Sequence, residues 1–193
     1  MNIKTLKSEN EFSQAINTIT EAFMADPVWS WMYPTESARL EAYPIFARAF
    51  TQQSYDNGSF YTDDSLNAVS AWVKPNVELN EHAIIDAISN TVQSKETSEA
   101  LFSIFEQFDA YHPGECWYLP VIGVLPNLQN QGLGTKLMLH TLSKIDSEKQ
   151  IAYLESTNAR NISFYEGFGF KVLGEVSAGN SPTIYPMLRQ AKS

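Results

Sequence analysis

The sequence predicts a mixed α/β fold in which helices flank one β-sheet of about six to seven strands. Three observations lead to this prediction. Long stretches place apolar residues at helical spacing, and short apolar or alternating runs between turn signals have the pattern of strands. In the second half of the chain, helical stretches alternate with strand-like runs, and helices between strands imply parallel pairing there.

The first 56 residues are expected to hold one strand and two helices. Residues 2–7 have the pattern of a strand, and residues 12–23 that of a helix whose candidate N-caps are Ser8 and Asn10. Asp26-Pro27 ends this helix, because the residue before a proline avoids the helical region. Residues 28–34 are aromatic and aperiodic, so we expect a loop that packs on the core or walls a pocket. A helix over residues 36–55 would have one apolar face, made of Leu40, Tyr43, Phe46, Ala47 and Phe50.

The remaining elements follow from turn signals and periodicity. Residues 59–62 and 68–73 predict a β-hairpin, and residues 79–110 predict two helices with a break near residues 94–98. The apolar run Trp117–Val124 suits a strand buried on both faces. Since side chains alternate along a strand, Tyr118 and Ile122 should share one face. Later elements are expected as a helix over 133–145, a strand over 151–154, a helix over 159–168 and strands over 170–176 and 183–188.

Length and composition indicate one globular domain over residues 1–193. Apolar residues make up 44% of the chain, which is enough for a core. The one cysteine, Cys116, allows no intrachain disulfide and no cysteine-based zinc cluster, so we expect a buried thiol and no metal. The sequence has no signal-peptide pattern and no apolar run of membrane length, so the expected location is cytoplasmic, with no membrane association.

The charge is unevenly distributed along the chain. The net charge is −9, and residues 1–115 hold 17 acidic and 6 basic residues, whereas residues 116–193 hold 5 and 7. No carboxylate occurs between Glu115 and Asp146. An acidic chain is a poor general nucleic-acid binder, so no nucleic-acid partner is expected. The stretch without carboxylates either handles an anion or reflects chance and a buried strand.

A glycine-containing segment, residues 124–135, joins the apolar run to the start of the next helix. The N–H groups at a helix N-terminus lack internal partners and carry the positive end of the helix dipole, and Gly132 and Gly134 let a ligand approach the backbone closely. This arrangement favours phosphate binding. The Gly-Lys-Ser/Thr ending of a Walker A loop is absent, and the spacing does not match the dinucleotide fingerprint. The alternative is that both glycines only allow close packing of helix on strand.

Two motifs resemble the GNAT family of N-acetyltransferases. The pattern Gln129-x-x-Gly132-x-Gly134, after a strand ending Val124-x-Pro126, is similar to the family's loop for the pyrophosphate of acyl-CoA. About 30 residues later, the stretch from Asn158 through Tyr165 to Phe170 resembles the family's Asn…Tyr-x-x-x-Gly-Phe element. The close resemblance covers roughly residues 115–176. It implies a centrally splayed sheet, with residues 116–193 as the acetyl-CoA-binding core and residues 1–115 mainly on the acceptor side.

The resemblance also implies which residues bind acetyl-CoA. Backbone amides of the loop would bind the pyrophosphate, and the splayed strand would pair with the pantetheine arm, with the Ile122 or Val124 N–H near the acetyl carbonyl. Asn158 matches the family asparagine on that arm, and Asn161 is a second candidate; for both, helix capping is the alternative. The implied cofactor residues are Ile122, Gly123, Val124, Gln129, Asn130, Gln131, Gly132, Leu133, Gly134, Thr135, Asn158, Asn161 and Tyr165.

For catalysis, the resemblance implies that Tyr165 is the general acid that protonates the leaving thiolate. The alternative for Tyr165 is a tyrosine packed on the sheet. A general base must take a proton from the attacking amine, directly or through water. Glu115, Tyr118, His112 and Glu155 are all possible, and we place Glu115 and Tyr118 first. Cys116 has no paired histidine in the motif and is not expected to be a nucleophile.

The expected function is acetyl transfer from acetyl-CoA to a primary amine by direct attack in a ternary complex. An acidic first half rich in aromatic residues (Trp29, Trp31, Tyr33 and Trp72) suits a small cationic amine such as a polyamine, amino sugar or amino acid. The alternatives are acetylation of a peptide N-terminus or lysine, a non-catalytic acyl-CoA sensor module, and an unrelated α/β domain whose glycine loop only packs. A homodimer is possible.

Overall fold

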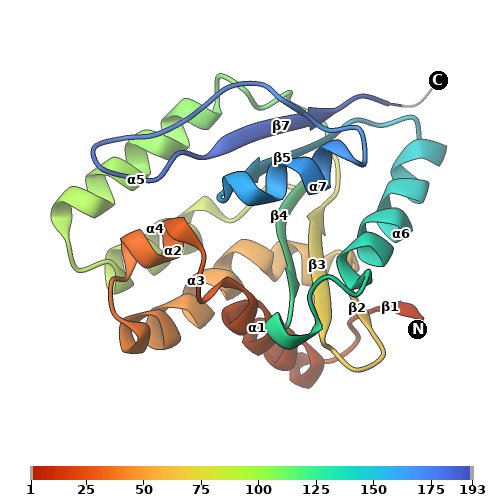
Figure 1. Cartoon of the computed structure of the whole chain (residues 1–193), viewed down its shortest axis with the longest axis horizontal. Coiled ribbons are helices and arrows are strands. Elements are labelled where there is room, and N and C mark those ends of the chain that lie inside the picture. Colours follow the sequence, from red (N-terminus) through yellow and green to blue (C-terminus); the bar gives the residue numbers. More distant parts are fainter. Residues whose placement is uncertain (1, 192–193) are drawn as a thin grey trace.

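The computed structural model describes residues 2–191 and has one seven-stranded sheet flanked by helices (Figure 1). The strand order is β1-β2-β3-β4-β5-β7-β6. The strands are β1 (Ile3–Thr5), β2 (Phe60–Asp63), β3 (Ala68–Val73), β4 (Trp117–Val124), β5 (Ala152–Ser156), β6 (Lys171–Val172) and β7 (Tyr185–Arg189). Only β4 and β5 pair in parallel; the other ladders are antiparallel. The predicted mixed α/β class is confirmed.

Two hydrophobic clusters cover the two faces of the sheet. Helices α1 to α5 contribute the buried residues of one cluster, and α6 and α7 those of the other. Strands β2 and β3 supply both, because their side chains alternate between the faces. The helices are α1 (Glu9–Phe23), α2 (Pro27–Met32), α3 (Glu36–Asp56), α4 (Glu81–Thr91), α5 (Lys95–Phe108), α6 (Leu133–Ser147) and α7 (Ile162–Glu166). In Figure 1, α4 and α5 lie at the end of the molecule opposite α6.

The segment 28–34 is mostly helical, which corrects the predicted loop. Asp26 caps α2: its carboxylate accepts hydrogen bonds from the Val28 N–H at 2.9 Å and the Trp29 N–H at 3.3 Å. Pro27 occupies the first turn, where its missing N–H costs nothing. Six residues are too few to show helical periodicity, so the cap and proline were the usable signals. The alternative that this segment walls a pocket agrees with Val28 and Trp29, which line a cavity described below.

Helix α3 confirms the expected span, but one residue of the predicted apolar face, Leu40, is exposed. Leu40 was placed on the apolar face, yet 51% of it is exposed, whereas Tyr43, Phe46 and Ala47 are buried. Pro44 lies inside this helix. Because proline has no N–H, the Leu40 carbonyl loses its normal helical partner and is better placed toward water.

The C-terminal strands differ from the prediction in pairing and length. β7 inserts between β5 and β6 and runs antiparallel to both, so the expected parallel pairing holds only for β4 and β5. The predicted strand over residues 170–176 is limited to Lys171–Val172, followed by an isolated bridge between Val176 and Ile184. The long connection between β6 and β7 allows the chain to return past β6 and reach β5.

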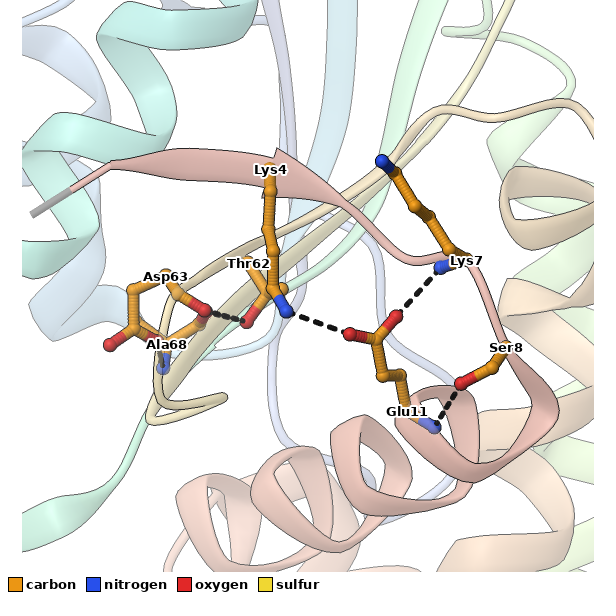
Figure 2. A network of polar contacts seen from close by, with 7 residues as sticks. All are labelled: Lys4, Lys7, Ser8, Glu11, Thr62, Asp63 and Ala68. Carbon is orange, nitrogen blue, oxygen red and sulfur yellow. Dashed lines mark hydrogen bonds and ion pairs between the residues drawn. The ribbon is translucent and has the colours of Figure 1, made fainter.

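At its N-terminal edge, the sheet is joined to α1 by a network of polar contacts (Figure 2). Ser8 is the N-cap of α1 and accepts from the Glu11 N–H, so Asn10 is not the cap. The Glu11 carboxylate accepts from the Lys7 N–H at 2.8 Å and from Lys4 Nζ at 2.7 Å. These hydrogen bonds, the Lys4 bond foremost, lower the pKa of Glu11. The network fixes β1 against the helix, away from the site described next.

Candidate active site

The central strand β4 contains a bulge at Leu119–Pro120. Val73 pairs with Tyr118 and Ala71 pairs with Val121, so two residues of β4 oppose the single residue Trp72 of β3. Proline suits this position because it has no N–H to offer the ladder. The bulge reverses the direction of the backbone groups: the Trp117 N–H donates toward β5, to Ile151, whereas the Leu125 N–H donates toward β3, to Asn67.

Beyond the bulge, β4 and β5 separate. Their ladder consists of Trp117 with Ala152 and Tyr118 with Tyr153, and no pair beyond Tyr118 forms within the described chain. Since the Leu125 and Gly123 backbones face β3, the N–H groups of Ile122 and Val124 face the gap toward β5. Backbone donors that face such a gap need a partner from outside the sheet. The gap therefore fits an extended ligand such as the arm of an acyl-CoA.

The bulge overturns two details predicted for β4. Tyr118 and Ile122 do not share a face: Tyr118 lines a large cavity together with Val121, whereas Ile122 packs with the cluster under α6. Gly123 has its backbone in the β3 ladder opposite Val69, and a Cβ there would lie 3.0 Å from the Cβ of Ala22. Gly123 therefore allows α1 to approach the sheet, and its amide is not free for a ligand.

The loop after β4 leads into α6 with an uncapped N-terminus. Gly132 is the N-cap residue, with φ +81°, no side-chain cap and no heavy atom within 4 Å of an added Cβ. Residues 126–128 form a 3₁₀ turn, and Asn130 also has a positive φ, of 59°. The first N–H groups of α6, at Leu133, Gly134 and Thr135, point out of the helix end without intrahelical partners. This end of the helix fits an anionic group such as a pyrophosphate.

Two side-chain hydrogen bonds to backbone carbonyls hold the conformation of this loop. Gln129 Nε2 donates to the Val124 carbonyl at 3.1 Å, and Gln131 Nε2 donates to the Asn127 carbonyl at 3.3 Å. A Cβ on Gly134 would lie 3.4 Å from the Phe164 ring, so this glycine allows α7 to pack closely. The packing alternative therefore describes Gly134. Gly132 lies open to solvent, as phosphate binding requires.

Two cavities meet beside the gap between β4 and β5. A small slot of about 50 Å³ lies between the strands and is lined by Leu119, Ile122, Leu154 and Tyr165. A much larger cavity, about 1320 Å³, lies among α3, α4, α5 and β4. Both are lined by the same four residues, Phe23, Pro120, Glu155 and Thr157. A group in the slot and a second molecule in the large cavity would therefore meet at these four residues.

Glu155 is the ionisable group at this junction. Burial raises the pKa of its carboxyl to about 7, although interactions with the hydroxyls of Tyr118 and Tyr153 act in the opposite direction. Burial and the nearby Glu155 charge raise the pKa of both tyrosines well above the usual value, so both stay protonated. At neutral pH, Glu155 can therefore exchange a proton, whereas the raised pKa of Tyr118 keeps its hydroxyl protonated and favours Glu155 over Tyr118 as the base.

The other candidate bases, Glu115 and His112, do not line the slot. Glu115 is exposed at the large cavity, where its carboxylate accepts from Asn76 Nδ2 at 3.0 Å. His112 lies near the same opening with its ring 5.0 Å from that of Tyr153, and burial lowers its pKa. Cys116 is buried, and its thiol lies 3.8 Å from His112 Nε2, a pair that the sequence motifs did not reveal. Burial raises the pKa of Cys116 to about 12, so it remains a neutral thiol.

Tyr165 and Asn161 line the slot, whereas Asn158 serves as a cap. Tyr165 is buried in the cluster under α6, and burial, with the charge of Asp26 as a second cause, raises its pKa. The Asn158 side chain accepts from the Arg160 N–H at 3.1 Å at the start of the 3₁₀ turn Ala159–Asn161. The capping alternative therefore describes Asn158, and Asn161 is the asparagine that faces the slot.

Sequence reasoning missed the contact between Asp26 and Thr157. Thr157 Oγ1 donates to the buried Asp26 carboxylate at 2.6 Å, which joins the start of α2 to the end of β5. Burial raises the pKa of Asp26 despite its three hydrogen bonds. The available signals were the cap position before Pro27 and the polar residues Glu155, Ser156 and Thr157 at the end of a buried strand.

Removing the Asp26 carboxylate should destabilise the fold more than removal of an ordinary cap. We expect Asp26→Ala to lower the free energy of unfolding by about 2–3 kcal/mol, because a cap is worth about 1 kcal/mol and Thr157 also loses its partner. Ser94→Ala is the matched control, since Ser94 caps α5 through one exposed bond to the Thr97 N–H. Urea unfolding measures both. Equal losses of about 1 kcal/mol would show that the contact with Thr157 adds nothing.

Within residues 2–191, no group of three or more histidine, cysteine, aspartate or glutamate side chains is placed to hold a metal ion. None of the described helices is long and apolar enough to cross a membrane.

Comparison with known proteins agrees with this geometry. A family model described as an acetyltransferase (GNAT) domain matches residues 100–172. Among solved structures, a histone acetyltransferase HPA2-related acetyltransferase from Corynebacterium glutamicum is 18% identical, with 100% of this chain and 98% of that chain covered and a TM-score of 0.69. Arylalkylamine N-acetyltransferase 2 from Aedes aegypti is 11% identical, with 99% of each chain covered and a TM-score of 0.63. Polyamine N-acetyltransferase from Drosophila melanogaster is 11% identical, with 98% of this chain and 99% of that chain covered and a TM-score of 0.64.

At these identities the solved structures establish the fold over the whole chain, and the family model identifies the domain. An unrelated α/β domain with a packing-only glycine loop is therefore the wrong interpretation. Residues 100–172 therefore match the GNAT acetyltransferase family, and the whole chain has the fold of GNAT acetyltransferases.

Proposed function

We propose that this protein acetylates a primary amine with acetyl-CoA, by direct attack within a ternary complex. The observation that carries the proposal is the junction of the two cavities at Phe23, Pro120, Glu155 and Thr157. One cavity lies beside the unpaired backbone of β4, and the other is large enough for a second substrate. Structural neighbours named for acetylating arylalkylamines, agmatine and polyamines support an amine as acceptor.

The donor would be held mainly by backbone groups. The amides of residues 130–135 would bind the pyrophosphate at the N-terminus of α6, and the Ile122 and Val124 N–H groups would bond to the extended arm. Gln129 keeps the loop in place through its bond to the Val124 carbonyl. Asn161, which lines the slot, would contact the same arm. When bound, acetyl-CoA supplies an activated acetyl thioester.

Two side chains would handle the protons. An amine arrives mostly as an ammonium ion, since a primary amine of the lysine type has a pKa near 10.4. Glu155, with a pKa of about 7, would accept the proton that must leave before attack. Tyr165, protonated in the slot, would donate to the departing thiolate. Thr157 and Asp26 would hold the end of β5 that carries Glu155.

The proposal is tested first by binding of the donor. Acetyl-CoA at 100 times its Kd should raise the unfolding free energy by about 2.7 kcal/mol, which corresponds to a rise in Tm of roughly 5–10 °C. Release of free CoA with a panel of amines then separates an enzyme from a binding-only sensor. No thermal shift at saturating acetyl-CoA would contradict both the enzyme and the binding-only sensor.

A substitution at Gly132 should weaken donor binding specifically. Gly132→Asp introduces a carboxylate at the open helix N-terminus, and we expect the Kd for acetyl-CoA to rise at least about tenfold, which is about 1.4 kcal/mol. Gly58→Asp is the matched control: Gly58 also has a positive φ, of 64°, and open space around its Cα, but lies in the turn before β2. Calorimetric titration with acetyl-CoA measures both. Equal weakening in the two variants would contradict an anion site at Gly132.

A further inference from the structure

The large cavity has a continuous aromatic wall. Five side chains that line it, which we call the aromatic wall, contact one another in sequence: Trp29, Phe46, Phe50, Phe105 and Phe108. The successive ring centroids are 4.6, 4.5, 6.2 and 6.1 Å apart. The wall therefore runs from α2 across α3 to α5. Of the four aromatic residues expected at the acceptor side, only Trp29 lines this cavity; Trp72, for example, is buried in the opposite cluster.

The cavity is large for a slender acceptor. Its volume of about 1320 Å³ exceeds the range of roughly 300–1,000 Å³ usual for small-molecule sites. A linear polyamine would leave most of the aromatic wall in contact with water. An apolar or aryl group would cover the wall and release that water, which is favourable in proportion to the apolar area buried. Volume and lining therefore favour an acceptor with a bulky apolar body.

The charges around the cavity determine what else the acceptor can carry. Six carboxylates line the cavity, against the three basic side chains Lys74, His82 and His112: these are Glu78, Glu81, Glu106, Asp109, Glu115 and Glu155. Burial lowers the pKa of His112, which leaves its ring neutral at pH 7. Such a lining attracts an ammonium group and repels a carboxylate on the acceptor.

We propose that the acceptor is a primary amine attached to a bulky apolar group, an aryl group for preference, and without a carboxylate. This inference rests on the proposed function and names its substrate class. The amine lies at Glu155, and the apolar body lies along the aromatic wall. In the transfer, the ammonium first gives one proton to Glu155, the neutral nitrogen then forms a bond to the acetyl carbon, and the bond from that carbon to sulfur breaks. Tyr165 gives its proton to the sulfur and is reprotonated by the second N–H proton that the nitrogen loses.

The test compares amines that differ in one property at a time. With saturating acetyl-CoA, kcat/KM for 2-phenylethylamine and tryptamine should exceed that for putrescine, spermidine and agmatine by about ten- to a hundredfold, the range expected for burying one aryl group. Phenylalanine, which adds a carboxylate, should be at least tenfold poorer than 2-phenylethylamine. Binding of the same amines to the CoA-saturated protein, measured by calorimetry, should follow the same order.

Substitutions in the aromatic wall test whether the preference for aryl amines comes from contact with this wall. Phe50→Leu should reduce kcat/KM for 2-phenylethylamine about five- to tenfold while changing that for ethylamine less than twofold. Tyr55→Leu is the matched control on the same helix: Tyr55 stacks on Phe12 with centroids 4.4 Å apart and does not line the cavity. Phe105→Leu is a second wall variant on α5, in case the Phe50 variant is unstable.

The outcomes separate the two proposals. Linear polyamines that bind and react as well as the aryl amines would overturn the inferred acceptor class while leaving the acetyltransferase intact. Tighter binding of aryl amines without acetylation of any amine would support the acceptor class and overturn the proposed enzymatic function. Equal effects of Phe50→Leu and Tyr55→Leu would overturn the role of the aromatic wall.

Discussion

Replacing Glu155 with glutamine should lower kcat/KM at pH 8 by about a hundredfold or more, the usual contribution of a general base. Glutamine keeps the size and one acceptor oxygen of the side chain but cannot take a proton from the amine. Steady-state release of CoA measures the loss. Glu115→Gln, which removes the other carboxyl candidate at the cavity, should cost less than about fivefold, because Glu115 is exposed and bonded to Asn76.

The pH dependence provides an independent readout of Glu155. Because its pKa is raised to about 7, the fraction in the active carboxylate form rises with pH, and kcat/KM should increase tenfold per pH unit below 7 and level off above it. The glutamine variant should lack this inflection. A wild-type profile that is flat between pH 5.5 and 8, or a larger loss for Glu115→Gln, would assign the base elsewhere.

The stability of the same variant checks that it folds. A carboxyl whose pKa is higher in the folded state than in the unfolded state binds more protons when folded, so the folded protein loses stability as pH rises from about 4.5 to 7. Glutamine has no such dependence. Glu155→Gln should therefore have a higher Tm than the wild type at pH 8, and the difference should shrink at pH 5.

Replacing Tyr165 with phenylalanine should lower kcat by about a hundredfold with less than a threefold change in the Kd for acetyl-CoA. The ring still fills its place under α6, but the slot loses the hydroxyl that donates to the leaving thiolate. Single-turnover kinetics and calorimetry separate the two parameters. Tyr61→Phe is the control, because Tyr61 is buried in the same cluster and does not line the slot. Unchanged turnover of the Tyr165 variant would contradict its role as the acid.

Much of the fold could be predicted because its signals are local. Helix α1, the β2–β3 hairpin, the break between α4 and α5 and the strand β4 follow from periodicity, caps and turn residues within short windows. Helix α2 has too few residues for periodicity, and only its cap Asp26 and Pro27 indicated it. The place of β7 between β5 and β6 depends on where a long connection returns, which no local pattern determines.

The candidate site was predictable where a motif resembles a family and not where geometry decides. The loop around Gly132 and the position of Tyr165 followed from the two motifs. The bulge at Leu119–Pro120 depends on pairing with β3, so the sequence could not reveal that Tyr118 and Ile122 face opposite sides. Glu155 was one base candidate among four until the structure placed it in both cavities. The two tyrosines that interact with Glu155, Tyr118 and Tyr153, lie on β4 and β5, and no short stretch of sequence shows that they lie together.

A crystal structure of the protein with acetyl-CoA would show whether acyl transfer takes place where the slot meets the large cavity. We expect the pyrophosphate on the amides of residues 130–135 and the acetyl group between β4 and β5, where the acetyl carbon is open toward Glu155 and the sulfur lies toward Tyr165. Acetyl-CoA bound at another surface, or an acetyl group separated from Glu155 by the closed sheet, would contradict it.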